Sequence, residues 1–154
     1  VGQVRRDPMA MKPFCGYNFA DYWSHWLSFE GRSDKLPRVF HVNWFRKDND
    51  GKFMWPGFGD NMRVLQWVLQ RCAGGGKAVK TPIGYIPDPS ALNINGLDLD
   101  RNTVNALLSI DAKTWRREID DIEAYFETFG EKLPQALSDT AKRIKAALED
   151  QLAA

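Results

Sequence analysis

Residues 39–61 read VFHVNWFRKDNDGKFMWPGFGDN, and this aromatic-rich segment predicts more of the architecture than any other part of the chain. Its first part, residues 39–45, is rich in β-branched and aromatic side chains and predicts a buried strand. The polar residues 47–51 predict a turn, in which Gly51 is free to take a positive φ angle. Residues 52–55 then return, so a hairpin is expected here.

Helices are predicted where apolar residues recur three and four positions apart. A first helix begins near Asn18, whose side chain can cap it, and ends at Gly31. After a turn at Pro56-Gly57, a second helix covers residues 61–72 and ends at the glycines that follow. The apolar face of this second helix comprises Val64, Leu65, Val68, Leu69 and Cys72.

The second half of the chain adds one short strand and a pair of helices. Residues 81–86 predict the strand. From residue 100 onward the pattern is helical, and two apolar stripes separated by Gly130 and Pro134 predict an antiparallel helical hairpin. The expected fold class is therefore α/β (α+β, helix-rich), with a few short strands and a helical C-terminal hairpin. We expect residues 1–154 to form a single unit.

The charge of the chain is balanced, with 21 Lys and Arg residues against 20 Asp and Glu residues. This balance argues against a nucleic-acid or anionic-membrane partner, which would require a basic excess. Since there is no long apolar run and no leader, we expect a soluble protein without a targeting signal. Cys15 and Cys72 lack metal-motif spacing, which favours free thiols in a reducing cytoplasm. Because the first residue is Val1 and not Met, we expect the tail of a longer polypeptide.

Two motifs that suggest chemistry fail on spacing. The run GGGK at residues 74–77 is not a phosphate-binding loop, because Arg71 replaces the first glycine and Ala78 replaces the Ser or Thr. It follows a helix and predicts a helix stop instead. His25 and His41 are the two histidines, and neither has a companion ligand at zinc spacing. We therefore expect no metal site in this chain.

The strongest functional signal is an aromatic slot around Phe58. This residue lies between Gly57 and Gly59, so its ring is carried on a loop with little local packing. Asp60 and Asn61 then open a helix and offer hydrogen-bonding groups beside the ring. A ring face next to polar edges suits a flat base, since stacking contributes about 1–3 kcal/mol per base. The alternative for the same residues is a hydrophobic core built around the hairpin.

The same residues resemble those of the GTP-dependent phosphoenolpyruvate carboxykinases. The similarity is carried by residues 40–48, 51–53 and 55–61, which read FHVNWFRKD, GKF and WPGFGDN. Further matches lie on both sides, at Arg6-Asp7-Pro8, Met11, Pro13-Phe14, Gly16-Tyr17-Asn18-Phe19, Thr81-Pro82-Ile83-Gly84-Tyr85 and Ala91-Leu92-Asn93. The resemblance extends over nearly the whole chain and weakens over the last helices.

This resemblance implies the C-terminal part of the nucleotide-binding domain of a cytoplasmic lyase. Such an enzyme decarboxylates oxaloacetate in gluconeogenesis, converting it with GTP into phosphoenolpyruvate, GDP and carbon dioxide, and uses Mn²⁺ and Mg²⁺. In the family, guanine lies between phenylalanine rings, and Asn61 corresponds to the residue at the base edge. The family usually has Glu at the position of Asp60. The resemblance assigns guanine binding to Phe45, Phe53, Phe58, Gly59, Asp60 and Asn61.

The resemblance places the rest of the active site outside this chain. The family's phosphate loop, metal ligands, reactive-loop cysteine and substrate arginines all lie upstream of Val1. We therefore expect no catalytic residue and no metal ligand here, an inactive isolated chain, and a partner in the upstream remainder of the same enzyme. The alternative is a stand-alone module whose aromatic groove binds a peptide or single-stranded nucleic acid. A third possibility is a structural tail in which Phe58 belongs to the core.

Overall fold

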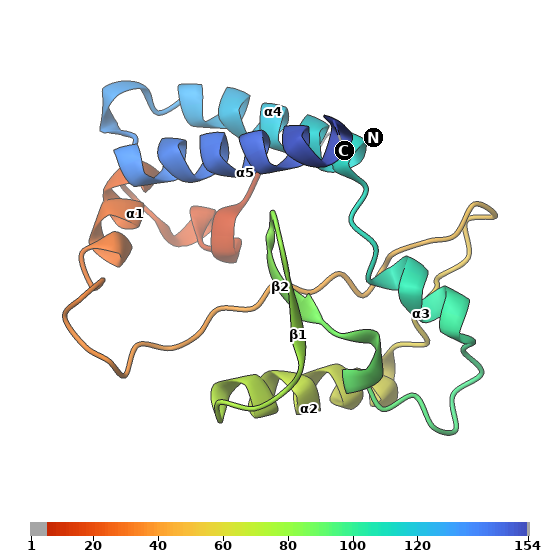
Figure 1. Ribbon diagram of the computed structural model, residues 1–154. Coiled ribbons are helices and arrows are strands. Elements are labelled where there is room, and N and C mark those ends of the chain that lie inside the picture. Colours follow the sequence, from red (N-terminus) through yellow and green to blue (C-terminus); the bar gives the residue numbers. More distant parts are fainter. Residues whose placement is uncertain (1–5, 154) are drawn as a thin grey trace. The chain divides into compact units, whose positions relative to one another are not determined.

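The computed structural model describes residues 6–153 and shows several helices with a small antiparallel sheet (Figure 1). The expected helix-rich α+β class is therefore confirmed. The residues divide into two compact units. The first comprises the described residues before Pro37 together with those from Asp111 on, and the second comprises residues 37–110. A single unit over residues 1–154 stays a prediction.

The first unit is built mainly from α1 (Phe19–Leu27), α4 (Ala112–Glu127) and α5 (Gln135–Ala153). Short 3-10 turns accompany them at Pro8–Ala10, Lys12–Phe14 and Gly130–Lys132. Helices α4 and α5 pack side by side (Figure 1), which confirms the predicted helical hairpin. Within the described residues, no helix combines the length and apolar character needed to cross a membrane.

Side-chain caps fix where these helices begin. The Asn18 side chain accepts a hydrogen bond from the Ala20 N–H at 2.9 Å, which confirms the predicted start of α1. The helix itself ends at Leu27, earlier than predicted, and turns follow as far as Gly31. Asp111 caps α4 in the same way. Hydrogen bonds from the side chain and backbone of Thr114 lower the pKa of the Asp111 carboxyl.

Trp23 is the centre of the core of the first unit. It lies beside the buried residues Phe19 and Ala20 on α1. Its ring centroid is 5.7 Å from that of Phe126 and 4.9 Å from that of Phe129, both in edge-on arrangements. The core thus joins α1 to the end of the helical hairpin.

Charged side chains connect α4 to α5 on the surface of the hairpin. The Lys145 Nζ lies 2.7 Å from an oxygen of Asp120 and 2.6 Å from an oxygen of Glu123. Its hydrogen bonds to these carboxylates raise the pKa of Lys145. Arg116 pairs with Asp120 within α4 and with Glu149 across the hairpin. Because these groups are partly exposed to solvent, each pair contributes little to stability.

The second unit contains α2 (Asn61–Cys72), the strands β1 (Ala78–Thr81) and β2 (Gly84–Pro87), and α3 (Arg101–Leu107). Two short 3-10 turns, Phe58–Asp60 and Pro89–Ala91, precede α2 and follow β2. Helix α2 stops at Cys72, and Gly74 takes a φ of 83° just beyond it. The triple glycine is therefore a helix stop, as predicted.

The single strand predicted over residues 81–86 is wrong, because the chain reverses inside it. Strands β1 and β2 form an antiparallel hairpin in which Thr81 pairs with Gly84 and Ala78 with Pro87. Pro82 restricts the backbone at the turn, and Gly84 has a φ of 125° that other residues rarely adopt. A run that resembles one strand thus becomes two.

The buried strand predicted over residues 39–45 is also wrong in this chain. These residues belong to neither strand of the sheet, and the nearest backbone pairing is an isolated bridge between Lys47 and Phe53. The side chain of Val39 is 81% exposed. A strand requires a partner backbone, and the described part of the chain supplies none for this segment.

The buried face of α2 differs from the predicted one. Trp67 is buried, and its indole N–H donates to the Lys77 carbonyl oxygen at 2.9 Å. Leu65 and Leu69, expected to face the core, are exposed. The indole offers more apolar surface than a leucine and also needs a hydrogen-bond acceptor, so it determines how the helix is rotated.

We expect the replacement of Trp23 by Ala to lower the free energy of unfolding by about 3–5 kcal/mol, because it empties the centre of the first unit. The matched control is Trp26→Ala on the same helix, where the side chain is 45% exposed. Its expected cost is below about 1 kcal/mol. Urea denaturation followed by circular dichroism measures both, and equal losses for the two variants would contradict this account of the core.

Candidate functional site

All six residues predicted to bind a base lie in the second unit, in two short segments at and before the start of α2. Phe45 and Phe53 flank the polar turn. Phe58, Gly59 and Asp60 form the 3-10 turn that leads into α2, and Asn61 is the first residue of that helix. The described structure therefore places the predicted residues within one compact unit.

The polar turn holds Phe45 and Phe53 next to each other. The Asp48 side chain accepts hydrogen bonds from the backbone N–H groups of Asp50 and Lys52 at 3.0 and 2.9 Å, and Gly51 has a φ of 78°. The centroids of the two phenylalanine rings are consequently 5.9 Å apart. The Lys47 Nζ lies 5.0 Å from the centroid of Phe53. Both rings are more than half exposed, so the pair forms a surface edge and not a core.

Phe58 is held in a strained and fully exposed position. Its φ is 44°, a value that is uncommon outside glycine, and the preceding Gly57 has a φ of 80°. The side chain is 99% exposed. It thus contributes nothing to the core of this unit, and backbone strain of this kind tends to occur at functional sites. Among the described residues, its ring forms no pair with Phe45 or Phe53.

Asn61 and Asp60 are each fixed by a hydrogen bond. The buried Trp55 donates its indole N–H to the Asn61 side-chain oxygen at 2.9 Å. This bond sets the orientation of the amide, whose Nδ2 donors have no acceptor among the described residues. The Asp60 carboxylate accepts a hydrogen bond from the Arg63 Nε–H at 3.0 Å. The Arg63 guanidinium also donates a hydrogen bond to the Asn93 carbonyl oxygen. The loop is therefore secured at both polar side chains.

Arg46 is a positioning residue that the sequence did not reveal. Its guanidinium donates to the Leu107 carbonyl oxygen at 2.9 Å and to the Ser109 hydroxyl at 3.1 Å. These bonds tie the polar turn to the end of α3, more than 60 residues away in the chain. No local sequence pattern predicts such a contact, because it depends on how the second unit folds.

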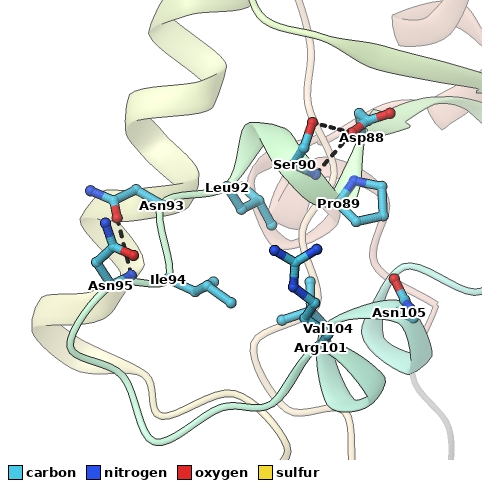
Figure 2. Close-up of a pocket in the computed structure, with 10 residues that line it drawn as sticks. All are labelled: Asp88, Pro89, Ser90, Leu92, Asn93, Ile94, Asn95, Arg101, Val104 and Asn105. Atoms are coloured by element: carbon cyan, nitrogen blue, oxygen red, sulfur yellow. Dashed lines mark hydrogen bonds between the residues drawn. The ribbon is translucent and has the colours of Figure 1, made fainter.

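A separate cavity of about 510 Å³ lies between the segment after β2 and α3 (Figure 2). Asp88 lies at its edge, and the Ser90 hydroxyl and backbone N–H lower the pKa of this carboxyl by hydrogen bonding to it. None of the six predicted residues lines the cavity, and no aromatic ring does. It therefore lacks the stacking surface that a base requires. The lining residues are Asp88, Pro89, Ser90, Leu92, Asn93, Ile94, Asn95, Arg101, Val104 and Asn105.

Metal ligands do not gather in the part of the chain that the structure describes. No group of three or more His, Cys, Asp or Glu side chains lies close enough to hold an ion there. Divalent metal ions therefore have no such cluster to bind within residues 6–153.

Comparison with known proteins confirms the resemblance seen in the sequence motifs. The family described as phosphoenolpyruvate carboxykinase C-terminal P-loop domain matches residues 1–147. A phosphoenolpyruvate carboxykinase (GTP) of Chlamydia pneumoniae is 52% identical over 98% of this chain, and that of Treponema pallidum strain Nichols is 51% identical over 95%. The chain spans 26% and 24% of the lengths of these relatives. A match of this extent does not support a stand-alone binding module.

We expect Trp55→Phe to lower the free energy of unfolding by about 1–2 kcal/mol. The substitution leaves the Asn61 side-chain oxygen without its donor and replaces a buried indole with a smaller ring. Trp44→Phe is the control, since Trp44 is only half-buried in the same unit. Urea denaturation compares the two. An equal cost for both substitutions would show that the bond between Trp55 and Asn61 does not stabilise the loop.

Proposed function

The chain belongs to the GTP-dependent phosphoenolpyruvate carboxykinase family, and on this basis we propose that it is the C-terminal portion of such an enzyme and supplies its guanine recognition. The full-length enzyme is then a carboxy-lyase. It converts oxaloacetate and GTP into phosphoenolpyruvate, GDP and carbon dioxide, the decarboxylation step of gluconeogenesis. Its proposed location is the cytoplasm.

Phe58 carries the proposal. A fully exposed phenylalanine on a strained backbone lacks stacking partners and carries a conformational penalty, and nothing within this unit compensates for either. A flat base that covers the ring offsets both costs, since stacking contributes about 1–3 kcal/mol. Phe45 and Phe53 supply a second aromatic surface in the same unit, and their edge-on contact leaves both rings accessible.

The polar edge of the base is assigned to the loop that enters α2. Asn61 offers amide N–H donors in an orientation that Trp55 fixes, and such donors suit the carbonyl oxygen of guanine. Gly59 lets the backbone approach the base closely because it has no side chain. Asp60 is engaged by Arg63, so its proposed role is to hold the loop in place.

Phosphoryl transfer requires more than base recognition. It depends on cationic groups and metal ions positioned around the phosphates. The proposed Mn²⁺ and Mg²⁺ ligands, phosphate loop and catalytic residues belong to the rest of the enzyme, and no residue of this chain is assigned to them. The partner of this chain is therefore the remaining polypeptide, and its ligand is GTP or GDP.

Phe58→Ala in the full-length enzyme is expected to raise the KM for GTP about tenfold, because it removes one stacking face. The melting temperature should stay unchanged, since the ring is 99% exposed. Phe29→Ala, at a 40% exposed phenylalanine of the first unit, should leave the KM for GTP unchanged. A normal KM for GTP in the Phe58 variant, with or without a loss of melting temperature, would exclude the guanine site.

The isolated chain is expected to release no phosphoenolpyruvate from oxaloacetate and GTP, even with Mn²⁺ and Mg²⁺ present. The groups that position the phosphates are proposed to belong to the rest of the enzyme. A coupled assay for phosphoenolpyruvate measures this, with the full-length enzyme as positive control. Turnover by the isolated chain would contradict the division of roles between this chain and the rest of the enzyme.

A further inference from the structure

The cavity in Figure 2 combines apolar side chains with one cationic group. Leu92 and Val104 in its wall are buried, and Ile94 is half-buried. The Arg101 guanidinium extends from α3 into the space between Leu92 and Pro89 (Figure 2). A volume of about 510 Å³ lies in the range of sites for small molecules. The cavity thus offers an apolar surface and a positive charge to a ligand of that size.

Arg101 has no anionic partner in the part of the chain that the structure describes. None of the ion pairs within residues 6–153 includes it. By contrast, Arg46 and Arg63 in the same unit are each held by acceptors of the protein itself. A guanidinium binds a carboxylate through two parallel N–H bonds, so a carboxylate is the group that best suits this position.

Asp88 restricts the charge that the cavity accepts. Its carboxylate lies at the edge and accepts hydrogen bonds from the Ser90 N–H at 2.8 Å and from the Ser90 hydroxyl at 2.6 Å. These bonds lower the pKa of Asp88, so the group is negatively charged at neutral pH. Because like charges repel, a second negative charge on the ligand is disfavoured. One carboxylate on an apolar body therefore fits better than a dicarboxylate or a phosphate.

Two arginines connect the walls of the cavity to the proposed base site. Arg63 donates to the Asn93 carbonyl oxygen in one wall and to Asp60 in the turn that leads into α2. Arg46, beside the polar turn, donates to the Leu107 carbonyl oxygen at the end of α3, and the same helix forms the other wall. A molecule that contacts both walls therefore also restrains both segments of the base site.

We propose that this cavity is a second ligand site, which binds a small monocarboxylate with an apolar body and thereby strengthens guanine binding. The coupling rests on the proposed function, whereas binding to the cavity does not. A ligand that bridges the two walls reduces their freedom, so the base has less of its site left to order when it binds. Such coupling is reciprocal, and GDP should strengthen carboxylate binding by the same factor.

Isovalerate is the probe for the cavity, and isovaleramide, which has the same shape without the charge, is the matched control ligand. In ligand-observed NMR titrations of the full-length enzyme without nucleotide, the dissociation constant should be about tenfold lower for the carboxylate. Arg101→Gln should abolish this difference, and Arg143→Gln, at an exposed arginine of α5, should preserve it. Equal binding of the two ligands, or a difference that survives Arg101→Gln, would overturn the proposal.

The role of Asp88 is tested with methylsuccinate, a dicarboxylate of similar size. The enzyme should bind it more weakly than isovalerate, because its second carboxylate meets Asp88 at the edge of the cavity. Asp88→Asn keeps the shape of the side chain, removes its charge and should narrow this difference severalfold. An unchanged ratio of the two dissociation constants would overturn the selection of a monocarboxylate.

Titration calorimetry with GDP tests the coupling. Saturating isovalerate should lower the dissociation constant of GDP about fivefold in the full-length enzyme, and isovaleramide at the same concentration should have no effect. An unchanged affinity for GDP in the presence of bound isovalerate would overturn the coupling. An enzyme that binds isovalerate through Arg101 but fails to bind GDP would support the cavity site and refute the proposed guanine site.

Discussion

The second unit depends on a requirement of buried indoles: the ring must be covered while its N–H finds an acceptor. Trp55 meets this requirement at the Asn61 side chain, and Trp67 meets it at the Lys77 carbonyl oxygen. The first bond orients the residue that opens α2, and the second ties α2 to the chain that enters β1. The loop around Phe58 has little packing of its own, and the bonds from Trp55 to Asn61 and from Arg63 to Asp60 hold it where it enters α2.

Several apolar side chains of this unit are exposed to solvent and are available for contact with a ligand or with further polypeptide. Phe58, Phe45 and Val39 expose most of their apolar surface, while Trp55 and Trp67 nearby are almost fully buried. The distribution separates groups that build the unit from groups that await a partner. For the rings near the polar turn, the partner that we propose is a base.

Much of the candidate site could be predicted because its residues are close together in the sequence. The glycines around Phe58 and the helix start at Asn61 are local features, and the structure contains both. The bond from Trp55 to Asn61 could not be predicted, since it depends on the conformation of the loop between them. The hydrogen bonds from Arg46 to the end of α3 could not be predicted either, since they join residues more than 60 positions apart. The cavity in Figure 2 is likewise invisible in the sequence, because segments after β2 and around α3 form it together.

Local sequence was enough to predict most of the helices, the cap at Asn18 and the hairpin of α4 and α5, because helical hydrogen bonds and spacing are local. Asn18 caps α1 as predicted, and Asp111 caps α4 through the same kind of bond. The buried face of α2 and the absence of a strand at residues 39–45 emerged only from the folded chain. Burial and strand pairing each require a second segment of polypeptide. The sequence of one segment shows what it prefers to contact but not where its partner lies.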